Sequence, residues 1–181
     1  MSRGSSTGGL KYTFGMNAQL PGAGQSADER KVAALMADVE RLRGDGRDAD
    51  AQRAFDQAAA LQPDHPLVLH EAARRAALGG DPVAARVMLQ RAVDSAPGHL
   101  PLWLSLAAVL RTLGLRDEEL AALERALALN PTHLIVLLQK AAVLDLMNRP
   151  RAAASIYGNA LQTLAPGARL PPAVDALLPV Q

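Results

Sequence analysis

Residues 100–133 read LPLWLSLAAVLRTLGLRDEELAALERALALNPTH, and this stretch decides the fold. It holds two runs with apolar residues at helical spacing, which are separated by Gly114. The second run ends before Pro131. Glycine accepts the left-handed conformation in which many helices end, and proline cannot continue a helix. The stretch therefore predicts a helix, a tight turn, a second helix and a turn marked by proline.

The same features recur every 34 residues along the chain. The turn residues between the two runs are Gly44-Asp45-Gly46, Gly79-Gly80, Gly114 and Asn148. Five further ladders share the period: Pro63, Pro97 and Pro131; Ala58, Ala92, Ala126 and Ala160; Phe55, Leu89, Leu123 and Tyr157; His65, His99 and His133; and Leu35, Leu69, Trp103 and Leu137. We use ladder for a set of similar residues that recur at this period, and several ladders in phase indicate a repeat architecture. The alanine ladder (Ala58, Ala92, Ala126 and Ala160) marks the places where two helices approach closely, and the ladder of large residues (Phe55, Leu89, Leu123 and Tyr157) lies three residues before it.

The folded part of the chain is expected to begin near Ser26. Ser26-Ala-Asp-Glu29 has the form of a capping box, in which the serine hydroxyl and the glutamate carboxylate satisfy helix N–H groups. Residues 1–25 are rich in Gly and Ser and show no hydrophobic period, so they are predicted to be a disordered tail. The alternative is that Tyr12 and Phe14 belong to a short segment that docks on a groove or on a partner.

The repeat resembles the tetratricopeptide repeat (TPR). The resemblance rests on bulk at places 4 and 24, small residues at places 8, 20 and 27, and proline at place 32 of each unit. Four units fit, at about 32–65, 66–99, 100–133 and 134–166. Val39 at place 8 and Glu119 at place 20 depart from the pattern, and Pro166 comes one residue late. The resemblance implies an all-α solenoid, a right-handed superhelix of helix-turn-helix units.

Composition narrows the class of function. The chain has no cysteine, which excludes disulfides, thiolate zinc sites and cysteine nucleophiles. The 19 basic and 18 acidic residues nearly cancel, so no large field indicates nucleic acid or an anionic membrane as a partner. The first residues contain no apolar run of the kind found in signal peptides, and no later run is long enough to span a bilayer. We expect a cytoplasmic protein.

The sequence offers no catalytic, cofactor or metal site. His65, His99 and His133 occupy equivalent places, which a solenoid translates along its axis, so they cannot converge on one ion and are expected to be turn and cap residues. His70 has no second histidine at the spacing of the helical zinc motif. Gly22-Ala-Gly24 lacks the flanking strand and the Lys-Ser/Thr of a phosphate loop. We expect that the chain is not an enzyme and holds no cofactor.

The TPR resemblance implies that the first helix of each unit lines a concave groove, chiefly through places 2, 5, 9 and 12. The candidate partner-binding residues are Met36, Glu40, Arg43, Leu67, His70, Arg74, Leu104, Ala108, Arg111, Ile135, Leu138 and Asp145. They describe a mostly apolar trough with arginines along one edge, which suits an extended or helical ligand with hydrophobic anchors and a carboxylate. The alternative is that the apolar places pack on neighbouring helices and the arginines are solvated. The places that hold a two-carboxylate clamp in chaperone-binding TPRs carry other residues here.

Residues 167–181 are predicted to form a short helix that caps the last unit, because Pro171-Pro172 can start a helix and Val174, Leu177 and Leu178 give it an apolar face. Segments near 138–142, 157–161 and 170–178 resemble the TPR region of bacterial aspartyl/asparaginyl β-hydroxylase-like proteins. Three functions follow: a non-catalytic module that binds a peptide or protein, a regulatory or substrate-presenting module of such an enzyme, and a scaffold that self-associates through the last helix.

Overall fold

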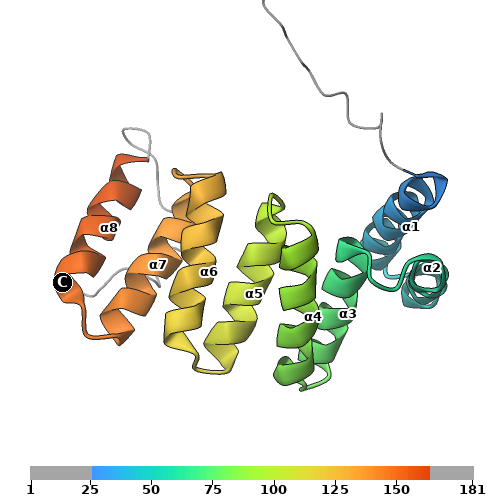
Figure 1. Ribbon diagram of the computed structural model, residues 1–181, viewed down its shortest axis with the longest axis horizontal. Helices are drawn as coiled ribbons and strands as arrows, with labels where there is room; N and C mark the ends of the chain where they lie inside the picture. Colours follow the sequence, from blue (N-terminus) through green and yellow to red (C-terminus); the bar gives the residue numbers. More distant parts are fainter. Residues whose placement is uncertain (1–25, 164–181) are drawn as a thin grey trace, which may run out of the picture.

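The computed structural model describes residues 26–163, and all regular structure in this range is helical (Figure 1). The range contains eight helices: α1 (Ala27–Gly44), α2 (Asp48–Leu61), α3 (Pro66–Leu78), α4 (Pro82–Ser95), α5 (Leu100–Thr112), α6 (Arg116–Leu129), α7 (Leu134–Leu146) and α8 (Pro150–Gln162). They pack as four successive pairs, which we number pair 1 (α1 and α2) to pair 4 (α7 and α8). The pairs stand in a row, so the predicted all-α solenoid is confirmed.

The turns inside the pairs have the conformation that the repeat predicts. Gly46, Gly80 and Gly114 have positive φ angles of 71°, 85° and 73°. Asn148, at the equivalent place of pair 4, has a φ of 56° and is the one residue other than glycine with positive φ among residues 26–163. Asparagine tolerates this region better than most side chains, which is why it can replace glycine in the last pair.

The helix ends also follow the sequence signals. Ser26 and Glu29 form the predicted capping box, with the Glu29 amide donating to the Ser26 Oγ at 3.1 Å and the Ser26 amide donating to the Glu29 carboxylate at 2.7 Å. Pro63, Pro97 and Pro131 each lie one residue beyond the cap of α2, α4 or α6. His65, His99 and His133 are the N-cap residues of α3, α5 and α7, which confirms that they are turn residues.

The alanine ladder lies where helices touch. Ala58, Ala92 and Ala126 have no exposed surface, and Ala160 is 1% exposed. The large ladder beside it is fully buried in the two central pairs, at Leu89 and Leu123. In pairs 1 and 4, which have a neighbour on one side only among the described residues, Phe55 and Tyr157 are half-buried.

The apolar core is divided. One cluster runs without a break from α3 to α7 and includes Leu69, Leu102 and Val143. Pair 1 forms a second cluster of its own, to which the rest of the chain contributes Val68 of α3 as a buried member. A third, small cluster joins α7 to α8. Pair 1 therefore shares little apolar core with pair 2.

Several predictions fall outside the described residues. These are the tail at 1–25, Pro166 and the capping helix at 167–181, together with the self-association assigned to that helix. α1 begins at Ala27, ahead of the first predicted unit at residue 32. Within residues 26–163, no helix is long and apolar enough to cross a membrane.

The close approach at the alanine ladder can be tested in α6. We expect Ala126→Leu to lower the free energy of unfolding by about 1–3 kcal/mol, because the added carbons have no space between the helices. Ala121→Leu, at an exposed place of the same helix, should change it by less than about 0.5 kcal/mol. Urea unfolding followed by circular dichroism measures both, and equal effects of the two substitutions would contradict this packing.

Candidate functional site

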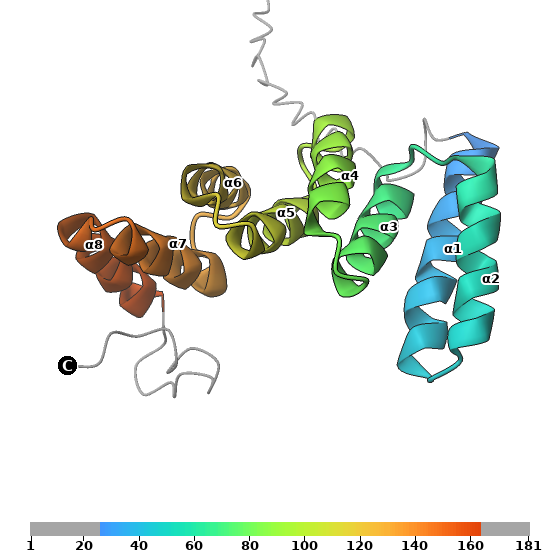
Figure 2. The same ribbon diagram turned by 90° about the horizontal axis from the view of Figure 1, so that it is seen from below.

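The first helices of pairs 1–3 lie next to one another along one side of the solenoid. α1 contacts α3, and α3 contacts α5, in addition to the contacts inside each pair. Figure 2 shows α3 and α5 on one side of the row, with α4 and α6 on the other. The first helices of successive units contact one another, so they lie along one side of the solenoid, which the TPR resemblance makes the inner side. We call this inner surface of α1, α3 and α5 the groove.

Two hollows in the groove adjoin each other. The large hollow has a volume of about 450 Å³. It is lined mainly by Glu40 and Arg43 of α1, His70, Arg74 and Ala77 of α3, and Ser105, Ala108 and Val109 of α5. The small hollow, of 220 Å³, is lined by Ala33, Met36, Ala37, Glu40, Leu67, His70 and Glu71. Glu40 and His70 line both, so the two form one continuous depression across three helices.

The structure brings together seven of the twelve candidate residues in these two hollows: Met36, Glu40, Arg43, Leu67, His70, Arg74 and Ala108. Four others lie along α5 and α7 outside the hollows: Leu104, Arg111, Ile135 and Asp145. Ile135 is 50% exposed, whereas Leu104 packs partly against the central core.

Leu138 does not belong to the groove surface. Its side chain is 1% exposed and packs with Leu137 and Ala160 in the cluster between α7 and α8. The prediction that it offers an apolar contact to a ligand is therefore corrected, because a ligand could reach it only if this cluster opened.

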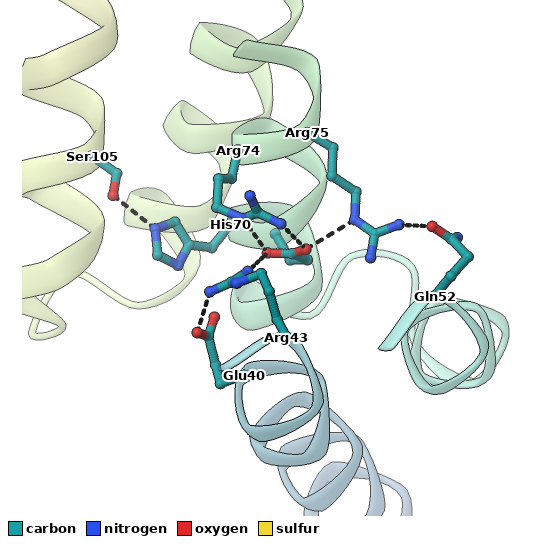
Figure 3. A network of polar contacts seen from close by, with 8 residues as sticks. Glu40, Arg43, Gln52, His70, Arg74, Arg75 and Ser105 are labelled. Atoms are coloured by element: carbon teal, nitrogen blue, oxygen red, sulfur yellow. Dashed lines mark hydrogen bonds and ion pairs between the residues drawn. The ribbon is translucent and has the colours of Figure 1, made fainter. Parts of the chain in front are cut away.

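One residue that lines the small hollow is a buried carboxylate. Figure 3 shows the polar residues around it, among them Arg43, Arg74 and Arg75. Glu71 of α3 is 3% exposed. Its Oε1 accepts hydrogen bonds from Arg74 Nη2 at 2.6 Å and Arg75 Nε at 2.9 Å, and its Oε2 accepts from Arg74 Nε at 2.7 Å and Arg43 Nη1 at 3.1 Å. Three arginines from two pairs therefore saturate one carboxylate.

This arrangement has a clear electrostatic consequence. Burial raises the pKa of Glu71, but the hydrogen bonds and charges of Arg74 and Arg75 outweigh it and lower the pKa from 4.5 to about 2. The same hydrogen bond raises the pKa of Arg74. Glu71 is thus ionised at neutral pH in spite of its burial.

The network continues to α2 and α1. Arg75 donates to Gln52 and lies over the ring of Phe55, with 4.1 Å between the guanidinium carbon and the ring centroid. Arg43 donates to Glu40 through its other terminal nitrogen. The polar contacts of Glu71 therefore join pair 1 to pair 2 where the apolar core is interrupted.

His70 connects α3 to α5 across the floor of the large hollow. Its Nε2 lies 2.7 Å from Ser105 Oγ. Burial lowers the pKa of His70, and the nearby His99 lowers it further. The imidazole is therefore neutral at pH 7 and fits a hydrogen-bonding role.

A second buried carboxylate explains the departure at place 20. Glu119 of α6 is 1% exposed, and it accepts from Arg111 Nε at 2.6 Å and from Arg116 Nη1 at 3.3 Å. The two arginines compensate for a charged residue where the repeat expects a small one.

The arginines at the groove edge are thus not simply solvated, as the alternative to ligand binding supposed. Arg74 and Arg111 each bind a buried glutamate. Replacing either by glutamate would place two carboxylates together in a buried site, so such variants are expected to harm the fold as well as any binding.

Sequence reasoning missed both buried glutamates. Arg74 and Arg75 follow Glu71 at helical spacings of three and four, which was the available signal. Nothing comparable identifies Arg43, which lies 28 residues away in the chain. Within residues 26–163, no three His, Asp or Glu side chains gather where a metal could bind.

A further depression, the outer hollow, lies on the other side of the solenoid. It has a volume of 410 Å³ and is lined by residues of α4, α5 and α6, among them Trp103, Arg125, Ala128 and Leu129. The Trp103 Nε1 donates to the Pro97 carbonyl oxygen at 2.8 Å. The outer hollow is lined largely by second helices and shares no residue with the groove.

The comparisons with known proteins agree with the fold. A family model of the tetratricopeptide repeat matches residues 100–144. The solved structure of MamA AMB-1 is 21% identical, with 86% of this chain and 82% of that chain covered and a TM-score of 0.61. MamA 41-end from Desulfovibrio magneticus RS-1 is 16% identical, with 73% and 75% covered and a TM-score of 0.61.

An O-GlcNAc transferase of Thermobaculum terrenum is 23% identical, with 66% of this chain and 23% of that chain covered and a TM-score of 0.56. Among curated proteins, none matches the sequence. These identities speak to the fold, and the fold is an all-α TPR solenoid.

The Glu71 network predicts a pH-dependent stability. Because the pKa of Glu71 is lower in the folded chain than the usual 4.5, its ionised form stabilises the fold above pH 4.5. This contribution is lost as the pH falls toward 2. We expect Glu71→Gln to lower the free energy of unfolding by about 3 kcal/mol at pH 7, and the difference from the wild type to shrink at acid pH.

Urea unfolding at several pH values measures this difference. Glu124→Gln is the control, because Glu124 pairs with Lys140 at 3.0 Å and its side chain is 55% exposed. This substitution should lower the free energy of unfolding by less than about 1 kcal/mol at each of these pH values. A Glu71→Gln variant as stable as the wild type at pH 7 would show that the network does not stabilise the fold.

Proposed function

We propose that this TPR solenoid is a non-catalytic module that binds a peptide or protein segment in the groove of α1, α3 and α5. The observation that carries the proposal is the continuous depression formed by the large and small hollows, of 450 and 220 Å³. The larger volume lies within the range of about 300–1,000 Å³ that is usual for ligand sites.

The lining of the groove has the mixed chemistry of a recognition surface. Half-buried Leu67 supplies apolar surface in the small hollow, and exposed Ala77 and Ala108 supply it in the large one. Met36 and Val109 also line the hollows, but they are only 6% and 8% exposed. Polar groups of His70, Ser105, Arg43 and Arg74 lie among them. Apolar surface with a few placed polar groups suits a segment with hydrophobic anchors and a polar or charged side chain.

The walls of the groove are held in place before any ligand binds. The hydrogen bond between His70 and Ser105 joins α3 to α5, and the ion pair between Arg43 and Glu71 joins α1 to α3. A preformed site loses less conformational entropy on binding than a mobile one. This supports recognition by the groove as a whole, across three repeats.

The experiment fills the large hollow without substituting any residue of the Glu71 network. Ala108 is exposed on α5 and lines the large hollow, so Ala108→Trp should fill it at little cost to the fold. The full chain is used as bait in lysate of the source cell, and the captured proteins are identified by mass spectrometry. We expect a protein retained by the wild type to be lost by Ala108→Trp, with binding weakened at least about tenfold.

Ala128→Trp is the matched control. Ala128 is also exposed and also lines a hollow, but that hollow is the outer one. It should capture the same protein as the wild type, and unfolding curves should confirm that both variants are folded. Capture that survives Ala108→Trp and is lost with Ala128→Trp would move the binding site to the outer hollow and contradict the proposal.

A second candidate is a non-catalytic part of a longer enzyme. The observation that favours it is the likeness to an O-GlcNAc transferase, in which the matched region is 23% of that chain. The resemblance to the TPR region of aspartyl/asparaginyl β-hydroxylase-like proteins belongs to the same class. The gene sequence distinguishes a part of a longer enzyme from a free module. A reading frame that continues past Gln181 into a His-rich double-stranded β-helix region would favour the hydroxylase, and a stop codon there would favour the free module.

A further inference from the structure

We propose that the groove recognises an acidic side chain within a partner segment, and that Glu40 occupies Arg43 in its place until the segment binds. The inference rests on the proposed function and names the chemistry of the partner at the same groove. It follows from the different character of the two carboxylates that Arg43 contacts (Figure 3).

One of these contacts is permanent. Arg43 Nη1 donates to Glu71 Oε2 at 3.1 Å, and the side chain of Glu71 is 4% exposed. Glu71 also holds Arg74 and Arg75. Leaving a buried carboxylate short of a donor is costly, so this side of Arg43 stays bound whether or not a ligand is present.

The other contact is exchangeable. Arg43 Nη2 binds Glu40, whose side chain is 61% exposed. An exposed ion pair between residues three apart on a helix changes an equilibrium constant by only about 1.4- to fivefold. Glu40 can leave Arg43 for water at that cost, because its carboxylate is already largely hydrated.

The charge of the site favours an incoming carboxylate. Arg43, Arg74 and Arg75 face the carboxylates of Glu40 and Glu71, so the cluster carries one positive charge in excess. Among residues 26–163, nothing bonds the Nη1 of Arg74, and Arg74 lines the large hollow together with Arg43. A ligand carboxylate that displaces Glu40 therefore meets one arginine with a freed nitrogen and a second with an unused one.

The position of Arg43 indicates an internal residue of the partner. Glu40 lines both hollows. On one side lies the apolar surface of Met36 and Leu67, and on the other lies that of Ala108 and Val109. Because the depression continues in both directions, a segment can run through it with an aspartate or glutamate at Arg43 and apolar residues before and after.

The test begins with random dodecapeptides displayed on phage as internal segments, which have no free carboxyl end. They are selected on the immobilised full chain, and each is then tested on Ala108→Trp. We expect the peptides that the wild type retains and Ala108→Trp loses to carry Asp or Glu within three residues of an apolar side chain. The best peptide is then synthesised with blocked ends, once with its acid and once with the corresponding amide.

Affinities for wild type and Glu40→Gln complete the cycle. Removing the internal competitor should tighten binding of the acidic peptide by up to about fivefold, the most that an exposed ion pair changes an equilibrium constant. The amide peptide should bind both proteins more weakly and gain less from the substitution. Glu29→Gln, in the capping box of the same helix and outside both hollows, is the control and should leave both affinities unchanged.

The outcomes separate this inference from the function on which it rests. Groove-dependent peptides without an acid, or an acidic peptide that binds Glu40→Gln no better than the wild type, would overturn the role of Glu40 and leave groove binding intact. The selection is repeated with a library whose peptides have free carboxyl ends. If only that library yields binders, the partner is recognised by its terminal carboxylate, which would overturn the proposal that it is recognised by an internal acidic side chain. Peptides that Ala108→Trp retains throughout would overturn the groove itself and the inference with it.

Discussion

The structure depends on alanines at the helix crossings. A single helix pair has two faces and cannot bury both by itself, so each pair relies on its neighbours for part of its core. Ala58, Ala92, Ala126 and Ala160 let the helices approach until these side chains have almost no exposed surface. That close packing, with the left-handed turn at the same place in every pair, sets the first helices side by side. The groove is a consequence of this constraint, since any repeat that stacks in this way places its first helices along one side.

The apolar packing between pairs is not uniform, and it is interrupted between pairs 1 and 2. From α3 to α7 one apolar cluster crosses every boundary between pairs, whereas pair 1 keeps a core of its own. Between pairs 1 and 2, the ionised Glu71 and its arginines replace much of the apolar contact. A buried charge network of this kind is favourable only when all its hydrogen bonds are made, which restricts α1 and α3 to one relative arrangement. The large hollow spans this junction, because Arg43 and Arg74 are both part of its lining.

The sequence predicts almost all of the fold but only part of the candidate site. The period alone predicts the helices, the turns at Gly80 and Asn148, and the buried ladder, because each of these depends on local residue type and spacing. The repeat pattern predicts less well which side chains face the groove. Place 5 of the repeat lies at the margin between groove and core, so it gives a half-buried His70 in pair 2 but a fully buried Leu138 in pair 4. Which of the two occurs depends on the side chains of α8 and the preceding helix that pack around it, and the repeat pattern does not specify them.

The two buried glutamates show why charged contacts escaped prediction and why they differ in consequence. Glu119 takes both its arginines, Arg111 and Arg116, from its own pair, so it stabilises pair 3 internally. Glu71 takes one of its three from α1, and through Arg75 it reaches α2, so it joins two pairs. The same residue type at a core position thus closes one unit in the first case and links two units in the second. Arg43 is the member of the link that also lines the large hollow, where its second terminal nitrogen binds Glu40. A group that replaced Glu40 on Arg43 would therefore act on the junction between pairs 1 and 2. The recognition that we propose for the groove and the orientation of the first pair would therefore both depend on Arg43.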